Sequence, residues 1–221
     1  MGVTYNPRIV TDGLVLALDA GNTKSYPGSG NTWYDLSGNG NNGTLVNGVG
    51  YEGTNGGSLS FDGVNDRVNV SSSSLSPTSG TLCFWIKSNT PRDIYNSHSG
   101  GWNQNTLWGQ GSNLSFRLSN GTANPGDVTI SSSLVFDNIF HFVCTTWTVG
   151  GERAIWLDGT KRASLTNTLQ FVPSSTFEVG YKSWAASYYS GNIYSVASYN
   201  KALTVAEVSQ NFNAQRGRFG L

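Results

Sequence analysis

A run of six residues that are all Gly or Asn, from 38 to 43, constrains this chain more than any other segment. Gly and Asn enter the positive-φ region most readily, so the run cannot continue a helix or a central strand. It predicts a tightly folded turn system, in which Asn side chains satisfy backbone groups that no ladder reaches. Because the strand-like Thr44-Leu45-Val46 follows, we place this loop at the edge of a β sandwich.

Composition narrows the class of protein. The 221 residues are 37% hydrophobic, which is enough to bury one core, so we expect a single domain. Only 12% are charged, and 13 basic residues balance 13 acidic ones, which leaves no basic field for nucleic acid. No run approaches the roughly 18 apolar residues of a membrane span. Residues 1–5 lack the apolar core of a secretory signal. We therefore expect no nucleic-acid or membrane partner and no secretion by a signal peptide.

Apolar and polar residues alternate with a period of two along much of the chain. Residues 59–61 and 67–70 show the alternation of half-buried strands, whereas 82–86 and 139–144 are apolar enough for central strands covered on both faces. Asp158-Gly159 closes a further strand with a strong turn signal. These patterns predict two packed antiparallel sheets.

One helix is predicted near the C-terminus. Thr204 and Glu207 have the spacing of a capping box, and Leu203, Val208 and Phe212 supply an apolar stripe that can dock on a sheet. The predicted fold class is therefore all-β, a two-sheet antiparallel sandwich with one short C-terminal helix.

The two cysteines, Cys83 and Cys144, each lie in an apolar strand-like run. We predict that both are buried free thiols that act as small apolar fillers. A disulfide would require them to face each other across strands, which sequence spacing does not show.

Several segments together resemble the laminin-G-like, concanavalin A-like jelly-roll superfamily. They are the stretch that begins with Gly13–Leu16 and ends with Asp35–Gly43, residues 58–66, the Ile155–Gly159 strand and turn, and residues 191–204. The resemblance implies a jelly-roll domain over residues 12–213, with an N-terminal arm at 1–11 and a tail at 214–221. The superfamily includes lectins, glycosidases and adhesion modules, so the resemblance specifies the fold more closely than the function.

The opening residues 1–16 and the ending Asn213–Leu221 are similar to stand-alone domains of tailed bacteriophages. This resemblance implies a virion surface protein, made in the host cytoplasm, that decorates or cements the capsid through protein–protein contacts. Its partners would be capsid or other virion proteins, and copies of the same chain in a homo-oligomer. The alternative is a carbohydrate-binding adhesion module of a tail or head fibre, with a host glycan as its partner.

Catalytic patterns are not found in the sequence. The chain has four glutamates, none with a carboxylate two positions away as in the glucanase motif, and Glu207 is already used by the helix cap. There is no Gly-x-Ser-x-Gly elbow. His141 lies in an apolar run and is predicted to be a sheet residue rather than a base. We expect no enzyme.

Four aspartates in Gly/Asn-rich turns are candidate calcium ligands, because calcium prefers several carboxylate and carbonyl oxygens. They are Asp19, Asp35, Asp62 and Asp66. The competing hypothesis is that each caps its own turn. The family resemblance favours the caps, because Tyr194 lies where related domains carry an acid. We therefore expect no cofactor, with calcium as the alternative.

Aromatic and amide residues in the loop regions are the candidate glycan site, because sugars stack on rings and bind amide groups. They are Tyr95, Trp102, Asn103, Asn105, Trp108, Trp184 and Tyr188. The same rings could instead cover a sheet face or form a protein interface.

At the C-terminus, Arg216, Arg218 and Phe219 are candidates for anchoring the chain to an acidic patch on a partner, and a frayed terminus is the alternative.

Overall fold

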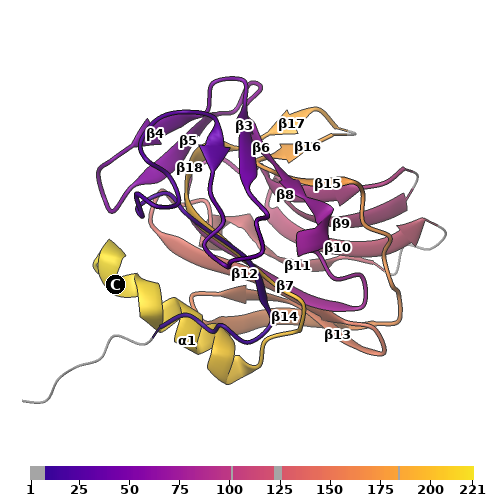
Figure 1. Ribbon diagram of the computed structural model, residues 1–221. Helices are drawn as coiled ribbons and strands as arrows, with labels where there is room; N and C mark the ends of the chain where they lie inside the picture. The colour runs from indigo at the N-terminus through magenta and orange to yellow at the C-terminus, as the bar shows by residue number, and fades with distance from the viewer. Residues whose placement is uncertain (1–7, 101, 122–125, 184) are drawn as a thin grey trace, which may run out of the picture.

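The computed structural model describes residues 8–100, 102–121, 126–183 and 185–221 (Figure 1). The predicted arm at 1–11 therefore lies partly outside the described residues, and so does Trp184. Two antiparallel eight-stranded sheets pack face to face, and a separate two-stranded hairpin lies beside them. This confirms the predicted sandwich.

Sheet A has the order β14-β13-β12-β7-β18-β5-β4, and β1 also pairs with β18. Its strands are β1 (Leu14–Asp19), β4 (Gly50–Glu52), β5 (Ser58–Asp62), β7 (Ser79–Lys87), β12 (His141–Thr148), β13 (Gly151–Leu157), β14 (Thr160–Asn167) and β18 (Ser190–Tyr199).

Sheet B has the order β11-β10-β9-β8-β15-β6-β3-β2. Its strands are β2 (Thr32–Trp33), β3 (Gly43–Val46), β6 (Arg67–Ser71), β8 (Asp93–His98), β9 (Trp102–Gln110), β10 (Asn113–Gly121), β11 (Val128–Ser131) and β15 (Thr176–Val179). The hairpin consists of β16 (Tyr181–Lys182) and β17 (Ser187–Tyr188). The short 3-10 turns are η1 (Ser72–Ser74), η2 (Ser132–Leu134) and η3 (Arg216–Phe219).

The main core lies between the two sheets, and β7 shows why sheet A needs a second cover. Leu82, Phe84 and Ile86 point into the main core, whereas Cys83 and Trp85 point away from sheet B into a second apolar cluster. Successive side chains of a strand face opposite sides. A strand that is apolar at every position must therefore be covered twice, as the sequence predicted for this segment.

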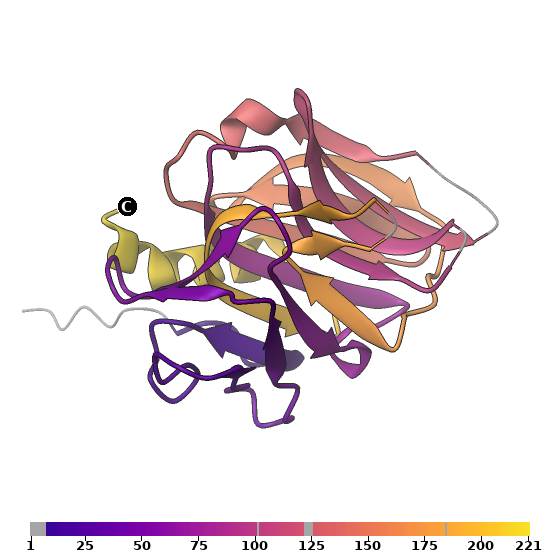
Figure 2. The same ribbon diagram turned by 90° about the horizontal axis from the view of Figure 1, so that it is seen from above.

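Helix α1 (Val205–Gln215) provides that second cover. Thr204 caps it with the reciprocal Thr204–Glu207 capping box that the sequence predicts. Phe212 stacks on Trp85 with ring centroids 5.7 Å apart. Figure 1 shows the yellow helix beside sheet A and the orange hairpin β16–β17 beside β8 and β15 of sheet B. In the turned view the helix and the β9–β10 hairpin lie toward opposite sides of the molecule (Figure 2).

The Gly/Asn-rich loop is built around Asp35. Its carboxylate accepts hydrogen bonds from the backbone N–H groups of Ala17 at 2.8 Å, Ser37 at 2.9 Å and Asn41 at 3.0 Å. Gly38 and Gly40 adopt positive φ, as the sequence predicts. Asp35 therefore acts as a turn cap that ties the loop to β1 at the edge of the sandwich.

The prediction of free thiols is wrong, because Cys83 and Cys144 form a disulfide. They occupy directly opposed positions on the neighbouring strands β7 and β12, with their Cα atoms 4.1 Å apart. The pairing depends on the register of two strands whose cysteines are 61 residues apart in the chain. Local sequence patterns do not contain that register.

Candidate functional site

The face of sheet B that points away from the core is polar, with Trp108 of β9 as its principal aromatic residue. Alternation along β9 and β10 sends Leu107 and Leu118 into the core, and Trp108 and Arg117 to the outer side. Only 8% of Trp108 is exposed. Lys182 from the hairpin places its Nζ 4.4 Å from the centre of the Trp108 ring, and the Arg117 guanidinium carbon lies 5.0 Å from it. Two cations therefore lie close to this ring.

A cavity of about 260 Å³ opens beside Trp108, and we call it the tryptophan pocket. Segments from three parts of the chain line it: the approach to β8, the β9–β10 turn and the β16–β17 hairpin. The lining residues are Pro91, Arg92, Asp93, Trp108, Gly109, Gln110, Gly111, Lys182, Ala185 and Ser187. The pocket thus combines an aromatic ring, a carboxylate, an ammonium group, an amide and backbone groups.

Asp93 and Lys182 form a buried ion pair in this pocket. Their side chains are 3% and 6% exposed, and Nζ lies 3.4 Å from Oδ1. Burial raises the pKa of Asp93, although the charge of Lys182 opposes the shift. Burial lowers the pKa of Lys182, although Asp93 opposes that shift. Both groups therefore lie under a desolvation penalty that their mutual attraction only partly offsets.

The Asp93 carboxylate retains unused hydrogen-bonding capacity. Its Oδ1 is buried and lies 3.4 Å from Lys182 Nζ, which is longer than an ordinary charge-assisted hydrogen bond. On the other side of Trp108, Arg117 forms a bidentate pair with Asp127, with N–O distances of 2.8 and 2.9 Å. Buried polar atoms are normally hydrogen-bonded. A buried carboxylate oxygen whose cation lies at this distance, in the wall of a pocket, is therefore suited to accept a further hydrogen bond from a bound hydroxyl group.

The hairpin covers part of this face through paired aromatic rings. Tyr181 and Tyr188 stack with centroids 4.6 Å apart, and the Arg67 guanidinium lies 5.4 Å from the Tyr181 ring. Ala186 in the connecting turn has a φ of 46°, a region that residues with a Cβ rarely adopt. Tyr188, which the sequence proposed for glycan contact, is half-buried here, next to the pocket but outside its lining.

Three of the proposed glycan residues are not available at the surface. Tyr95 is fully buried, stacks on Phe84 and hydrogen-bonds through its hydroxyl to Asn105 and Thr145. Asn103 bonds both the N–H and the C=O of Val172. A bulge between positions 93 and 95 of β8 turns Tyr95 inward. The structure therefore corrects the proposal for Tyr95, Asn103 and Asn105, whereas glycan contact by Trp108, which lines the tryptophan pocket, stays a prediction.

Trp102 and Trp184 also belong to the proposed glycan site. Trp184 lies outside the described residues, and of Trp102 only the strand position in β9 is described.

Sequence reasoning missed Asp93 and Lys182. The Asp93-Ile94-Tyr95 stretch gave no signal for them, because the ion pair joins strands that are distant in the sequence.

The four candidate calcium aspartates act as caps within their turns, and Asp62 and Asp66 share one turn. Asp19 accepts a hydrogen bond from the Gly21 N–H, and Asp62 accepts from the N–H groups of Val64 and Asn65. Asp66 accepts from the Asp62 N–H and is buried. No group of three or more His, Cys, Asp or Glu side chains that could hold a metal ion occurs among the described residues.

The proposed C-terminal anchor is largely part of the domain itself. Phe219 is buried and its ring lies 4.4 Å from that of Trp85, so the structure corrects its assignment as a partner contact. Arg218 pairs with Asp19 at 2.7 Å and donates to the carbonyl of Gly57 at 2.8 Å. Arg216 alone of the three remains exposed. These contacts hold η3 against sheet A.

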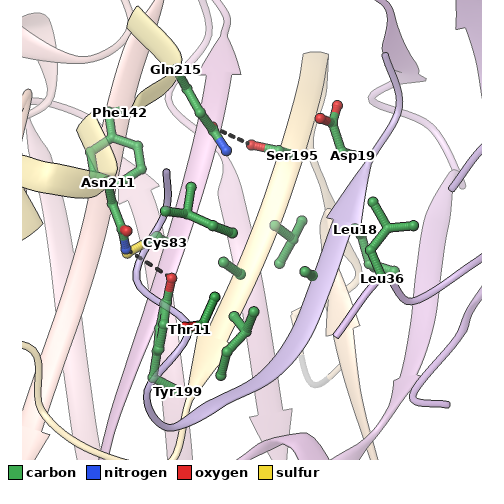
Figure 3. Close-up of a pocket in the computed structure, with 15 residues that line it drawn as sticks. Thr11, Leu18, Asp19, Leu36, Cys83, Phe142, Ser195, Tyr199, Asn211 and Gln215 are labelled. Carbon is green, nitrogen blue, oxygen red and sulfur yellow. Dashed lines mark hydrogen bonds between the residues drawn. The ribbon is translucent and has the colours of Figure 1, made fainter. Parts of the chain in front are cut away.

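A second cavity, of about 220 Å³, lies between α1 and β1 on the outer face of sheet A (Figure 3). We call it the helix cavity. Gln215 and Asn211 reach it from the helix, Ser195 from β18, and Leu18 and Asp19 from β1. Its lining is mainly apolar, in contrast to the tryptophan pocket.

His141 is a structural residue at the start of β12, as the sequence predicts. Its Nδ1 lies 2.9 Å from Asp158 Oδ2 and its Nε2 lies 3.1 Å from Asp137 Oδ1. Burial alone would lower the pKa of His141, but the hydrogen bond to Asp158 and the charges of both aspartates outweigh burial and raise it.

Among the described residues, no helix is long and apolar enough to cross a membrane.

Solved structures similar to this chain include binding domains of botulinum neurotoxins and of Paraclostridial Mosquitocidal Protein 1. The binding domain of botulinum neurotoxin DC in complex with SialylT aligns with a TM-score of 0.69 and 16% identity, over 92% of this chain and 52% of that one. The same domain in complex with rat synaptotagmin II gives 0.70 and 19%, over 93% and 52%. The binding domain of Paraclostridial Mosquitocidal Protein 1 gives 0.66 and 18%, over 92% and 52%.

The chain thus spans about half the length of these structures, and at such identities the likeness shows the fold. No curated protein matches by sequence. The family model for Laminin_G_3, described as the concanavalin A-like lectin/glucanases superfamily, matches residues 61–209. This chain, with its two-sheet sandwich and helix-covered outer face, therefore belongs to the concanavalin A-like lectin/glucanase superfamily.

Proposed function

We propose that this chain is a non-enzymatic binding domain that holds a saccharide in the tryptophan pocket. The observation that carries the proposal is the buried Asp93–Lys182 ion pair in the pocket wall, whose Nζ–Oδ1 distance is 3.4 Å, beside the ring of Trp108. Saccharide sites combine a ring for the apolar sugar face with acceptors and donors for the hydroxyl groups. Asp93 would accept a hydroxyl hydrogen bond, and Lys182 and the Gln110 amide would donate.

Binding rather than hydrolysis is supported by the charges around the pocket. A glycosidase needs two carboxyl groups across the scissile bond, roughly 5 to 10 Å apart. The described lining of the tryptophan pocket contains one carboxylate, Asp93, and the group that faces it is the Lys182 ammonium. The toxin structures with the same fold are named as binding domains, and two of them are complexes with SialylT and with rat synaptotagmin II. Since the fold alone is shared, those ligands only support the class of function.

A glycan array followed by titration calorimetry with the best saccharide tests the proposal. Asp93→Asn should weaken binding at least tenfold, because it removes the charged acceptor while keeping the size of the side chain. Trp108→Phe should weaken binding, and Trp156→Phe is the matched control, because Trp156 is a buried tryptophan under a lysine on sheet A. The proposal is wrong if no saccharide binds at millimolar concentration, or if Asp93→Asn binds as well as the native chain.

The setting we propose is the surface of a tailed-phage virion, supported by the resemblance of residues 1–16 and 213–221 to phage domains. In that setting the domain would either attach to host glycans from a fibre or decorate the capsid through protein contacts. Arg216 is the exposed residue of the proposed C-terminal anchor that remains open to a partner.

Copy number per particle, measured by quantitative mass spectrometry of purified virions, separates these two roles. A handful of copies supports a fibre adhesin that uses the tryptophan pocket. Hundreds of copies support capsid decoration. Absence of the chain from purified particles would overturn the virion setting and leave saccharide binding to be judged by the array.

A further inference from the structure

We propose that the helix cavity is a second, independent ligand site, for a small uncharged organic molecule that consists of one ring or a short alkyl chain with a single hydroxyl or carbonyl oxygen. This site lies on sheet A, under helix α1, whereas the proposed saccharide site lies on sheet B.

The cavity exists because three small side chains lie in a row across sheet A. Ala17 of β1 is directly opposite Ala197 of β18, and Ala197 is directly opposite Cys83 of β7. Helix α1 packs its aromatic residue Phe212 over Trp85 instead of over this row. The resulting volume is about 220 Å³. Since an apolar cavity of about 150 Å³ accommodates benzene, this one has room for a ring with a substituent.

Water is a poor occupant of the inner part of this cavity. The Asn211 Nδ2 donates to the Tyr199 hydroxyl at 2.9 Å, and that hydroxyl donates to the Val10 carbonyl at 3.1 Å. The Val10 N–H donates to Asn211 Oδ1 at 2.8 Å. These polar groups already satisfy one another, whereas a buried water needs two to four partners. An apolar ligand would displace weakly held water, which favours binding.

The other end of the cavity selects the polar group of the ligand. Ser195 donates to Gln215 Oε1 at 3.1 Å, which fixes the amide, and no described group accepts a hydrogen bond from Gln215 Nε2. That N–H is therefore the donor for a ligand oxygen. The Asp19 carboxylate also lines this end and is paired with Arg218, and the described lining contains no cationic side chain that would hold an anion, so an anionic ligand is disfavoured. An uncharged hydroxyl or carbonyl compound meets both conditions.

Leu36 marks the opening of the cavity. It is 41% exposed and lines the cavity, and its N–H donates to the Ala17 carbonyl at 2.8 Å. The Gly/Asn-rich loop that carries Leu36 is held to β1 through Asp35. A small molecule can therefore enter beside Leu36 without displacing the helix.

The test is a two-dimensional NMR titration of the whole chain with benzyl alcohol, and with benzoate as the anionic analogue. Benzyl alcohol should shift the amide resonances of Ala17, Ala197 and Gln215 in a saturable manner, and benzoate should shift them at least tenfold more weakly. Ala197→Leu fills the floor and should weaken benzyl alcohol binding at least tenfold. Ala206→Leu, the same substitution at an exposed position of α1, should leave it unchanged.

A second variant keeps the proposal testable if Ala197→Leu does not fold. Gln215→Leu should weaken the binding of benzyl alcohol while leaving that of toluene unchanged, because only the alcohol uses the amide. Unsaturable or absent shifts, or equal binding by Ala197→Leu and the native chain, would overturn the site. The saccharide that binds the tryptophan pocket should bind these variants normally, so failure here is distinct from failure of the proposed function.

Discussion

Each outer face of the sandwich carries a tryptophan under a lysine, and the two pairs are built differently. On sheet B, Lys182 Nζ lies 4.4 Å from the Trp108 ring, and its partner Asp93 is as buried as the lysine. On sheet A, Lys161 Nζ lies 5.4 Å from the Trp156 ring, and its partner Glu152 is exposed. The Asp93–Lys182 pair is therefore buried, whereas the Glu152–Lys161 pair is exposed to solvent.

The difference indicates which face serves saccharide binding. A solvated pair such as Lys161–Glu152 costs little and contributes little. A desolvated pair such as Asp93–Lys182 is often no more stabilising than apolar residues of the same size. Stability alone therefore does not explain Asp93 and Lys182, whereas a ligand that completes their hydrogen bonds does. The outer face of sheet A is instead covered by α1 and residues 8–11, which leave only the mainly apolar helix cavity between α1 and β1.

The largest expected effect comes from breaking the buried pair. Lys182→Met should lower the free energy of unfolding by about 3 kcal/mol, because it leaves the Asp93 carboxylate buried without a cation. The matched variant Lys161→Met should lower it by less than about 1 kcal/mol, because Glu152 remains solvated. Urea unfolding of both variants measures the difference. Equal losses would mean that the two faces do not differ in the way described.

The disulfide should matter for sheet A alone. Replacing both Cys83 and Cys144 by Ala should lower the free energy of unfolding by roughly 2 to 4 kcal/mol, since the bond closes a long loop. Saccharide affinity of the folded variant should stay within about twofold of the native value. A large loss of affinity without unfolding would show that the two faces are coupled.

Removing both members of the buried pair separates stability from function. The double variant Asp93→Leu/Lys182→Met should be within about 1 kcal/mol of the native stability, or above it, because no unpaired charge remains. Its saccharide binding should fall more than tenfold. Thermal unfolding and calorimetry on the same sample give both values. A double variant that loses stability but keeps its affinity would contradict the assignment of the pair to binding.

His141 should give a smaller, pH-dependent effect on the sheet A side. Its pKa is raised in the folded state, so its contribution is fully present below the unfolded pKa, near 6.5, and is lost as the pH rises through the folded pKa. Relative to His141→Asn, the native chain should gain about 1 kcal/mol at pH 6 over its value at pH 9. A stability difference between the two proteins that does not change with pH would refute the role of Asp137 and Asp158.

The smallest expected effect concerns calcium. Because Asp19, Asp35 and Asp62 accept hydrogen bonds from backbone amides in their turns, we predict that EDTA does not change the unfolding temperature. A calorimetric scan with EDTA and with added calcium measures this. A clear downward shift with EDTA, restored by calcium, would establish the calcium alternative.

Local patterns were sufficient to predict the fold. The alternation in β5 and β6, the doubly apolar β7 and the Thr204–Glu207 cap are each determined within a few residues, and all were confirmed. The Gly/Asn run likewise predicted the Asp35 turn system. These features depend on backbone preference and strand period, which neighbouring residues specify.

The candidate site depends on long-range register, and sequence reasoning recovered only part of it. Trp108 was identified, but Asp93 and Lys182 approach it from strands far apart in the chain. Tyr95 was misassigned because the β8 bulge shifts which residues face the core. The disulfide was missed for the same reason, since it requires the register of β7 against β12.

The most direct test of the difference between the two faces is a chemical-shift map of the best saccharide from the array. Titration of the isotope-labelled chain should shift the Trp108 indole N–H and the amide resonances of Asp93 and Lys182, and leave the Trp156 indole N–H and α1 unchanged. Shifts confined to sheet A and α1, with the Trp108 indole unaffected at saturation, would contradict the account.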